Sequence, residues 1–316
     1  MHRLAAVFAV FLVFIPALLQ ADEGIKLGTD LGLQLSSRPE AKIGLTQSFT
    51  FPFLQGSSPL TLGNNIKTAV TAEATPISLA GITQVIWTPI AFLELVGGGK
   101  LGSGWNIPLG KGLGLNVPVG VYNPEAPREA EVIGRAFDGF IWNAWGGGAF
   151  QFDMAAIIPG DWNHVIFRAY NELRYSAYTR AGPSDSWFFE NGDGENRNGW
   201  TWHGNMVLGY QMPLSPVLDF VGLMAEMHFN LYNTPGREFW GDNLGLWIFS
   251  SFFNFSFTPR FSTTLVIQMR TRRNHGITDF ENRDQLWYQD LELLNDGGPQ
   301  RLVFYRTALI LSYKIK

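Results

Sequence analysis

Residues 301–315, close to the end of the chain, read RLVFYRTALILSYKI and alternate between apolar and polar side chains. The odd-numbered positions include Val303, Tyr305, Thr307, Leu309, Leu311, Tyr313 and Ile315. The even-numbered positions include Arg306, Ala308, Ser312 and Lys314. Successive side chains of a β-strand point to opposite sides, so this period of two predicts a strand with one apolar and one mainly polar face.

The same alternation recurs in residues 165–177, 217–231 and 261–269. No run after residue 21 approaches the about 18 apolar residues that a membrane-spanning helix needs, since the richest, residues 244–257, is interrupted by glycine, serine and asparagine. The alternation alone also suits a soluble sandwich with its apolar face inward.

Connection lengths favour a barrel over a sandwich. Toward the C-terminus, tight connections at residues 158–163, 213–216 and 258–260 alternate with long polar ones at residues 180–199, 232–243 and 273–300. Outer-membrane barrels keep short turns at one end and long loops at the other, and aromatic girdles mark their two interfaces with water. Trp187, Trp200 and Trp247 flank the long loops, as a girdle would.

The whole chain after residue 21 divides into strands of this kind. We predict an all-β, transmembrane, antiparallel up-and-down barrel of about 14 strands, an even number. Twelve is the alternative, because glycine-rich residues 97–114 and proline-broken residues 122–128 blur the boundaries. The predicted strands are residues 26–36, 42–53, 65–75, 77–87, 90–96, 113–122, 133–144, 148–157, 164–179, 200–212, 217–231, 244–257, 260–272 and 301–315.

The first 21 residues have the features of a secretory signal peptide. His2 and Arg3 precede an apolar run over residues 4–19, and the segment ends at Ala21. We therefore expect a signal peptide at residues 1–21 and a single barrel domain at residues 22–316. The chain contains no cysteine, which excludes disulfides, thiolate metal sites and a lipoprotein anchor.

With these features the chain resembles the bacterial outer-membrane β-barrel proteins. That resemblance implies a place in the cell outer membrane, contact with its lipid, and insertion by the barrel assembly machinery, which reads an amphipathic last strand ending in an aromatic residue. Here the last strand is present, but the chain ends in Lys316. Only 16% of residues are charged, the net charge is −4, and no long basic run exists, so nucleic-acid binding is not expected.

If the apolar face of each strand contacts lipid, the charged residues on the opposite face line the lumen. These residues fall into two groups. An acidic wall is predicted from Asp30, Glu73, Glu94, Asp138 and Asp153, and a basic wall from Arg168, Arg174, Arg270, Arg272, Arg306 and Lys314. A water path between such walls would carry a transverse field. The alternative is a narrow barrel plugged by salt bridges.

The sequence offers no convincing catalytic constellation. The five histidines form no i,i+4 metal pair, no G-x-S-x-G elbow is present, and no metal site or cofactor is expected. We therefore predict a porin-like channel for passive or weakly selective passage of small polar solutes. The alternatives are a fatty-acid-type transporter of hydrophobic substrates, a barrel lipid hydrolase, and a surface adhesin or structural barrel. The oligomeric state and the solute are left open.

Overall fold

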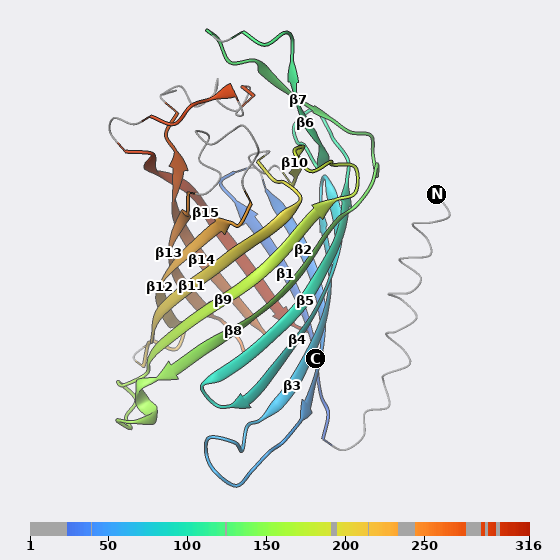
Figure 1. The fold of residues 1–316 in the computed structure, drawn as a ribbon. Helices are drawn as coiled ribbons and strands as arrows, with labels where there is room; N and C mark the ends of the chain where they lie inside the picture. Colours follow the sequence, from blue (N-terminus) through green and yellow to red (C-terminus); the bar gives the residue numbers. More distant parts are fainter. Residues whose placement is uncertain are drawn as a thin grey trace.

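A computed structural model describes residues 24–38, 40–123, 125–190, 195–213, 215–232, 244–275, 286–287, 290–294 and 298–316 (Figure 1). Within these ranges, twelve antiparallel strands close into one barrel, in which each strand pairs with two neighbours. The expected signal peptide at residues 1–21 lies outside the described residues. The predicted antiparallel barrel is confirmed, with the lower of the two strand numbers.

The barrel strands follow one another around the wall in chain order, and β15 closes onto β1. They are β1 (Lys26–Ser36), β2 (Ala41–Pro52), β3 (Asn65–Thr75), β4 (Ser78–Ile90), β5 (Leu93–Gly104), β8 (Ile141–Asp153), β9 (Val165–Tyr178), β11 (Gly199–Gln211), β12 (Leu218–Asn230), β13 (Leu246–Ser256), β14 (Phe261–Arg273) and β15 (Gln300–Lys314).

The barrel has two strands fewer than the 14 predicted, because one predicted strand lies outside it and two others are mostly replaced by a single strand. Residues 113–122 form β6 (Leu113–Val119), which pairs with β7 (Glu129–Ile133) and β10 (Ser186–Phe189) in a separate three-stranded sheet. Figure 1 shows β6 and β7 beyond one end of the barrel. The predicted strands 133–144 and 148–157 are largely replaced by the single strand β8, because the glycines between them stay extended and paired.

Glycine in this region permits close packing inside the barrel instead of breaking the strands. Gly97, Gly98 and Gly99 of β5 pair with Gly146, Trp145 and Ala144 of β8. A Cβ atom on Gly98 would come within 2.4 Å of the Trp145 ring, so only glycine leaves room for that ring. The glycine-rich segment is therefore part of the wall.

The register shifts once in the closing pair of strands. Gln268 of β14 pairs with Arg306 of β15, but the next residue, Met269, pairs with Phe304. Tyr305 is left unpaired, as in a β-bulge, which changes the direction of the side chains that follow it. Leu302 and Phe304 are each 56% exposed, so Val303 and Tyr305 do not continue the apolar face of residues 307–315 as the sequence had predicted.

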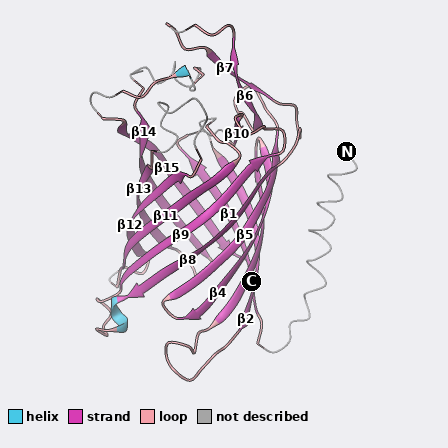
Figure 2. Ribbon diagram, in the orientation of Figure 1, coloured by secondary structure: helices cyan, strands magenta, loops and turns pink. Residues whose placement is uncertain are grey.

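The two ends of the barrel differ. One, here called the turn end, holds the start of β1, the end of β15 and the 3-10 helix η1 (Met154–Ala156) between β8 and β9 (Figure 2). The other, the loop end, carries the β6–β7–β10 sheet and the strand ends that flank the predicted long connections at residues 180–199, 232–243 and 273–300. Among the first four strands the connection lengths are reversed. The connections at residues 37–40 and 76–77 are short although they lie at the loop end, and the connection at residues 53–64 is longer although it lies at the turn end.

Two groups of aromatic residues lie near the loop end, in addition to the stacked pair Trp247 and Phe249 of β13. Trp142, Tyr175 and Trp200 form a continuous row on β8, β9 and β11, with ring centroids 5.1 and 5.4 Å apart, and Trp142 and Trp200 are exposed. Trp187 of β10 instead is 4% exposed and packs with Leu113 of the same small sheet and with Ile141 and Tyr178 of the barrel. Among the described residues, no helix has the length and apolar character needed to cross a membrane.

Candidate functional site

The two faces of the barrel wall have opposite chemistry. On β11 to β14, large apolar side chains such as Met206, Leu223 and Phe249 are exposed, as the outer face of a membrane barrel requires. The opposite parity carries buried polar side chains, for example Ser250 and Gln268, whose amide nitrogen donates a 2.9 Å hydrogen bond to the serine hydroxyl. This distribution is the reverse of a soluble protein's and leaves the lumen as the candidate site.

One part of the lumen, which we call the lysine sector, consists of Lys42 on β2, Glu73 on β3 and Lys100 on β5. The Glu73 carboxylate lies 3.6 Å from the Lys42 ammonium and 3.3 Å from that of Lys100. Glu190, which directly follows β10, adds a second carboxylate, 3.0 Å from Lys42 and 3.8 Å from Lys100. Two lysines and two glutamates thus form a closed network.

Glu190 comes from a loop, and it ties that loop to the barrel interior. The Ser78 hydroxyl of β4 donates a 3.0 Å hydrogen bond to its carboxylate. Burial opposes ionisation of Glu190, but the charges of Lys100 and Lys42 and these hydrogen bonds outweigh it, so the pKa of Glu190 lies below its ordinary value. Its backbone φ of +54° is rare for a residue with a side chain. The ion pairs offset that strain.

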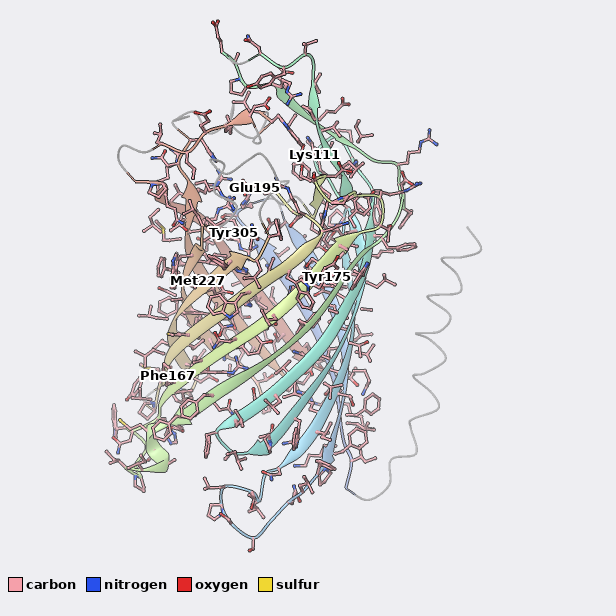
Figure 3. All side chains as sticks on the ribbon, in the orientation of Figure 1. Lys111, Phe167, Tyr175, Glu195, Met227 and Tyr305 are labelled. Atoms are coloured by element: carbon pink, nitrogen blue, oxygen red, sulfur yellow. The ribbon has the colours of Figure 1, made fainter. Side chains whose placement is uncertain are left out.

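The same loop contacts another side of the lumen. Glu195 forms an ion pair with Arg273, at the end of β14. It also lines a small cavity together with His228, Ile248 and Arg270 from the inward faces of β12 to β14. In Figure 3 Glu195 lies toward the loop end, whereas Phe167 marks the turn end of β9. The described residues on both sides of residues 191–194 are therefore anchored to different parts of the wall at one end of the lumen.

A second part of the lumen, the arginine sector, is built around the bulge at Tyr305 (Figure 3). The guanidinium carbons of Arg270, Arg306 and Arg38 lie 4.3, 4.9 and 5.2 Å from the centre of the Tyr305 ring, within cation–π range. Arg306 also donates to the Glu40 carboxylate at 2.7 Å and to the Gln268 amide oxygen at 2.6 Å. Positive charge is thereby concentrated around an aromatic surface.

A cavity of about 500 Å³ lies between the two sectors. It is lined by Lys42 and Glu190 from one side and by Tyr305, Arg306 and Glu40 from the other. Apolar loop residues complete the lining, among them Ile107, Leu109 and Phe189. The cavity thus offers cationic, anionic and aromatic groups to a small molecule.

The residues predicted for the acidic wall have different positions. Asp30, Glu73 and Glu94 lie on the inward parity of β1, β3 and β5. Asp153 is the last residue of β8 and lies 2.8 Å from the His164 ring at the turn end. Asp138 is not on a strand, because β8 begins at Ile141; it lies in the connection after β7 and pairs with Arg180.

The residues predicted for the basic wall also differ in their contacts. Arg168 of β9 lies 3.0 Å from Glu94, and Arg174 lies 2.7 Å from Glu172 of its own strand. Arg270 and Arg272 line the small cavity near Glu195, and Arg306 belongs to the arginine sector. Lys314, at the end of β15, is opposite Asp30 in the register. Of these basic residues, Arg168 and Arg174 of β9 thus each meet a carboxylate on the inward face.

The sequence-based prediction missed Lys42, Lys100, Glu190 and Tyr305. The two lysines have inward parity on their strands and could have been found by alternation. Glu190 could not, because it is a loop residue whose partners are distant in sequence, and Tyr305 faces inward only because of the bulge.

Fold and site together define an antiparallel transmembrane-type barrel with an apolar outer face and a charged lumen.

No protein-family model and no curated protein matches the chain. Among solved structures, the chain is similar to the NanC porin, with 8% identity, a TM-score of 0.40, and coverage of 91% of this chain and 98% of that one. It is also similar to the KdgM porin, with 10% identity, a TM-score of 0.37, and coverage of 92% and 99%. A third similar structure is OmpT of Vibrio cholerae, an outer-membrane protein, with 6% identity, a TM-score of 0.35, and coverage of 93% and 99%. At such low identity, function has to be argued from the residues of this chain.

Proposed function

We propose that this protein is a porin-like channel of the bacterial outer membrane for small polar solutes, exported by a signal peptide at residues 1–21. The observation that carries the proposal is the cavity of about 500 Å³ between the lysine and arginine sectors. Its charged side chains face the interior of a barrel whose outside is apolar. A polar passage through an apolar layer is the arrangement that water-filled barrels use.

The chemistry of the lumen favours polar over hydrophobic substrates. Arg168, Glu94 and Lys100 lie on inward faces in ion pairs, and a fatty-acid-type path would have to desolvate them. A barrel lipid hydrolase would need a nucleophile beside a histidine. The described partners of His203 are Glu172, Glu226, His228 and the ring of Tyr170, whose hydroxyl donates to Glu172. Weak preference for anions follows from the guanidinium groups around Tyr305.

Conductance across a planar lipid bilayer tests this function. The folded protein, identified by migrating faster on a gel before boiling than after, should produce discrete current steps in potassium chloride. The boiled protein is the control and should be silent. If folded wild type and folded Glu190→Gln are both silent, the lumen is sealed by its own salt bridges and the channel proposal is rejected.

A further inference from the structure

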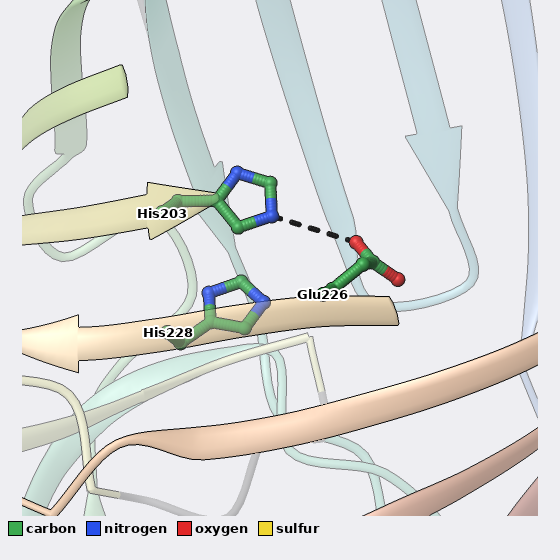
Figure 4. Close-up of side chains that lie close together, drawn as sticks. All are labelled: His203, Glu226 and His228. Atoms are coloured by element: carbon green, nitrogen blue, oxygen red, sulfur yellow. Dashed lines mark ion pairs between the residues drawn. The ribbon is translucent and has the colours of Figure 1, made fainter. Parts of the chain in front are cut away.

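Two histidines and a glutamate lie side by side on the inward faces of β11 and β12 (Figure 4). His203 of β11 pairs directly with His228 of β12, and Glu226 precedes His228 by two residues, which puts it on the same face. Directly opposite residues of an antiparallel pair have Cβ atoms about 4.5 to 5.5 Å apart. The register of two adjacent strands therefore brings these three side chains together.

The spacing of their polar atoms suits a bound ion. One ligand atom from each of the three residues lies within 4.8 Å of the others. The His203 Nε2 atom and the Glu226 Oε1 atom are 3.5 Å apart. That distance is long for a hydrogen bond, whereas a tetrahedral ion with bonds of about 2.0 to 2.2 Å separates its ligands by about 3.3 to 3.6 Å. The His203 and His228 rings stack with their centroids 4.4 Å apart.

His203 Nε2 is also unsatisfied in the described structure. It is buried and has no hydrogen-bond partner among the described residues. Most buried polar side-chain atoms in proteins have a hydrogen-bond partner, so a buried ring nitrogen whose contact with a carboxylate is only at ion-pair distance needs an explanation. A cation between Nε2 and Glu226 would satisfy both atoms.

A second carboxylate lies at ion-pair distance from the other side of the His203 ring. Its Nδ1 atom lies 3.8 Å from the Glu172 Oε1 atom. Glu172 is itself fixed, because it accepts hydrogen bonds from the Tyr170 hydroxyl at 2.5 Å and from Arg174 Nε at 2.8 Å. A carboxylate behind a histidine orients the ring and directs the other nitrogen toward a metal.

We propose that His203, Glu226 and His228 bind a divalent transition-metal ion of the zinc class inside the lumen. Imidazole and carboxylate ligands suit Zn²⁺ and its neighbours in the first transition row. Three protein ligands leave a coordination position for water or a solute, and the exposed His228 provides access from the lumen. The site does not depend on whether the barrel conducts.

Metal binding by the folded full-length protein tests the proposal directly. The protein in detergent is stripped with a chelator and dialysed against Zn²⁺ or, in parallel, Co²⁺. We expect one equivalent of either ion and, for Co²⁺, visible absorption typical of a coordinated ion. His228→Gln and Glu226→Gln should each weaken binding more than about 10-fold, and Glu172→Gln, behind His203, by about 10- to 100-fold.

His164→Gln is the matched control. His164 also contacts a carboxylate, that of Asp153, but it lies at the turn end and away from the cluster. This variant should bind as the wild type does, and the gel shift before boiling shows whether each variant is folded. Equal uptake by wild type and by the folded double variant His203→Gln/His228→Gln would overturn the proposal, as would a loss in His164→Gln equal to that in His228→Gln.

Discussion

The lysine sector and the arginine sector use positive charge in different ways. In the lysine sector, Lys42 and Lys100 are matched by Glu73 and Glu190, so the charges hold a loop against the wall. In the arginine sector, guanidinium groups gather around the uncharged ring of Tyr305. An ammonium group acts as a point charge, whereas a planar guanidinium both stacks on a ring and hydrogen-bonds at its edge.

Charge on the inward face therefore has two separable uses in the proposed channel. In this channel, ion pairs between the loop and the lysine sector would determine how much of the mouth is occupied. Charge around Tyr305 would determine which ions prefer the space that remains. Both uses require that the two sectors face inward.

The largest effect is expected from a charge on the outer face. Leu309 of β15 is exposed on the apolar side, and Ser312 of the same strand has the inward parity shared by Ser262. Leu309→Arg should lower the free energy of unfolding by about 2 to 4 kcal/mol, because the guanidinium would face hydrocarbon. Ser312→Arg should change it by less than about 1 kcal/mol. Urea unfolding in lipid vesicles measures both, and equal costs would mean that the parity is wrong.

A smaller effect is expected from releasing the loop. Glu190→Lys replaces two ion pairs of the lysine sector with repulsion, and these side chains are only partly buried. The loop contact should weaken by about 1 to 2 kcal/mol, which is a factor of about 5 to 30 in its population. Single-channel conductance should rise, while ion selectivity should change less than it does for a variant of Arg270. Unchanged conductance in a folded variant would show that this loop does not narrow the path.

Strands were predictable from the sequence wherever alternation was strong. The predicted 260–272 and 301–315 differ from β14 and β15 by about one residue at each end, because period-two apolar patterning is a local property. The sequence predicts a barrel strand over residues 113–122, which contain β6, because their alternation looks like that of a barrel strand. Only long-range pairing with β7 and β10 distinguishes it.

The candidate site was less predictable for the same physical reason. The inward parity of Glu73 and Arg168 follows from their own strands, but the Tyr305 bulge reverses parity within β15, and a single such shift moves a side chain to the other face. A search for histidines at helical spacing also misses His203 and His228, which meet only through the register of β11 with β12.

Selectivity should depend on the arginine sector. Arg270→Glu changes the charge beside Tyr305 by two units whatever its other contacts are, and Arg306→Glu does the same beside Glu40. Both should shift the reversal potential in a salt gradient toward cations. The shift should weaken at high salt, since the screening length falls from about 10 Å at 0.1 M to about 3 Å at 1 M. Lys67→Glu on β3, in the part of the barrel near the turn end, provides a variant with the same charge change. If Lys67→Glu shifts the reversal potential as much as Arg270→Glu does, the effect comes from the total charge of the lumen and not from the arginine sector.

The smallest effect is expected from acidification, which acts on the lysine sector through Glu190. Burial raises the pKa of its carboxyl, and the nearby Lys100 and Lys42 lower it further than burial raises it, so the folded pKa lies below the ordinary value of 4.5. A depressed carboxyl pKa contributes stability that is fully present above 4.5 and is lost as pH falls through the folded pKa. The loop should therefore stay in place from neutral pH down to about pH 5 and loosen only below about pH 4.5.

Protonation of Glu190 removes its charge but keeps a group that can still hydrogen-bond with Ser78, which is why the change in conductance should be smaller than in Glu190→Lys. Single-channel conductance recorded from pH 7 to pH 3 should show a rise in wild type that is absent in Glu190→Gln, whose side chain cannot titrate. A rise of the same size in both proteins would assign the acid response to other carboxyls of the lumen.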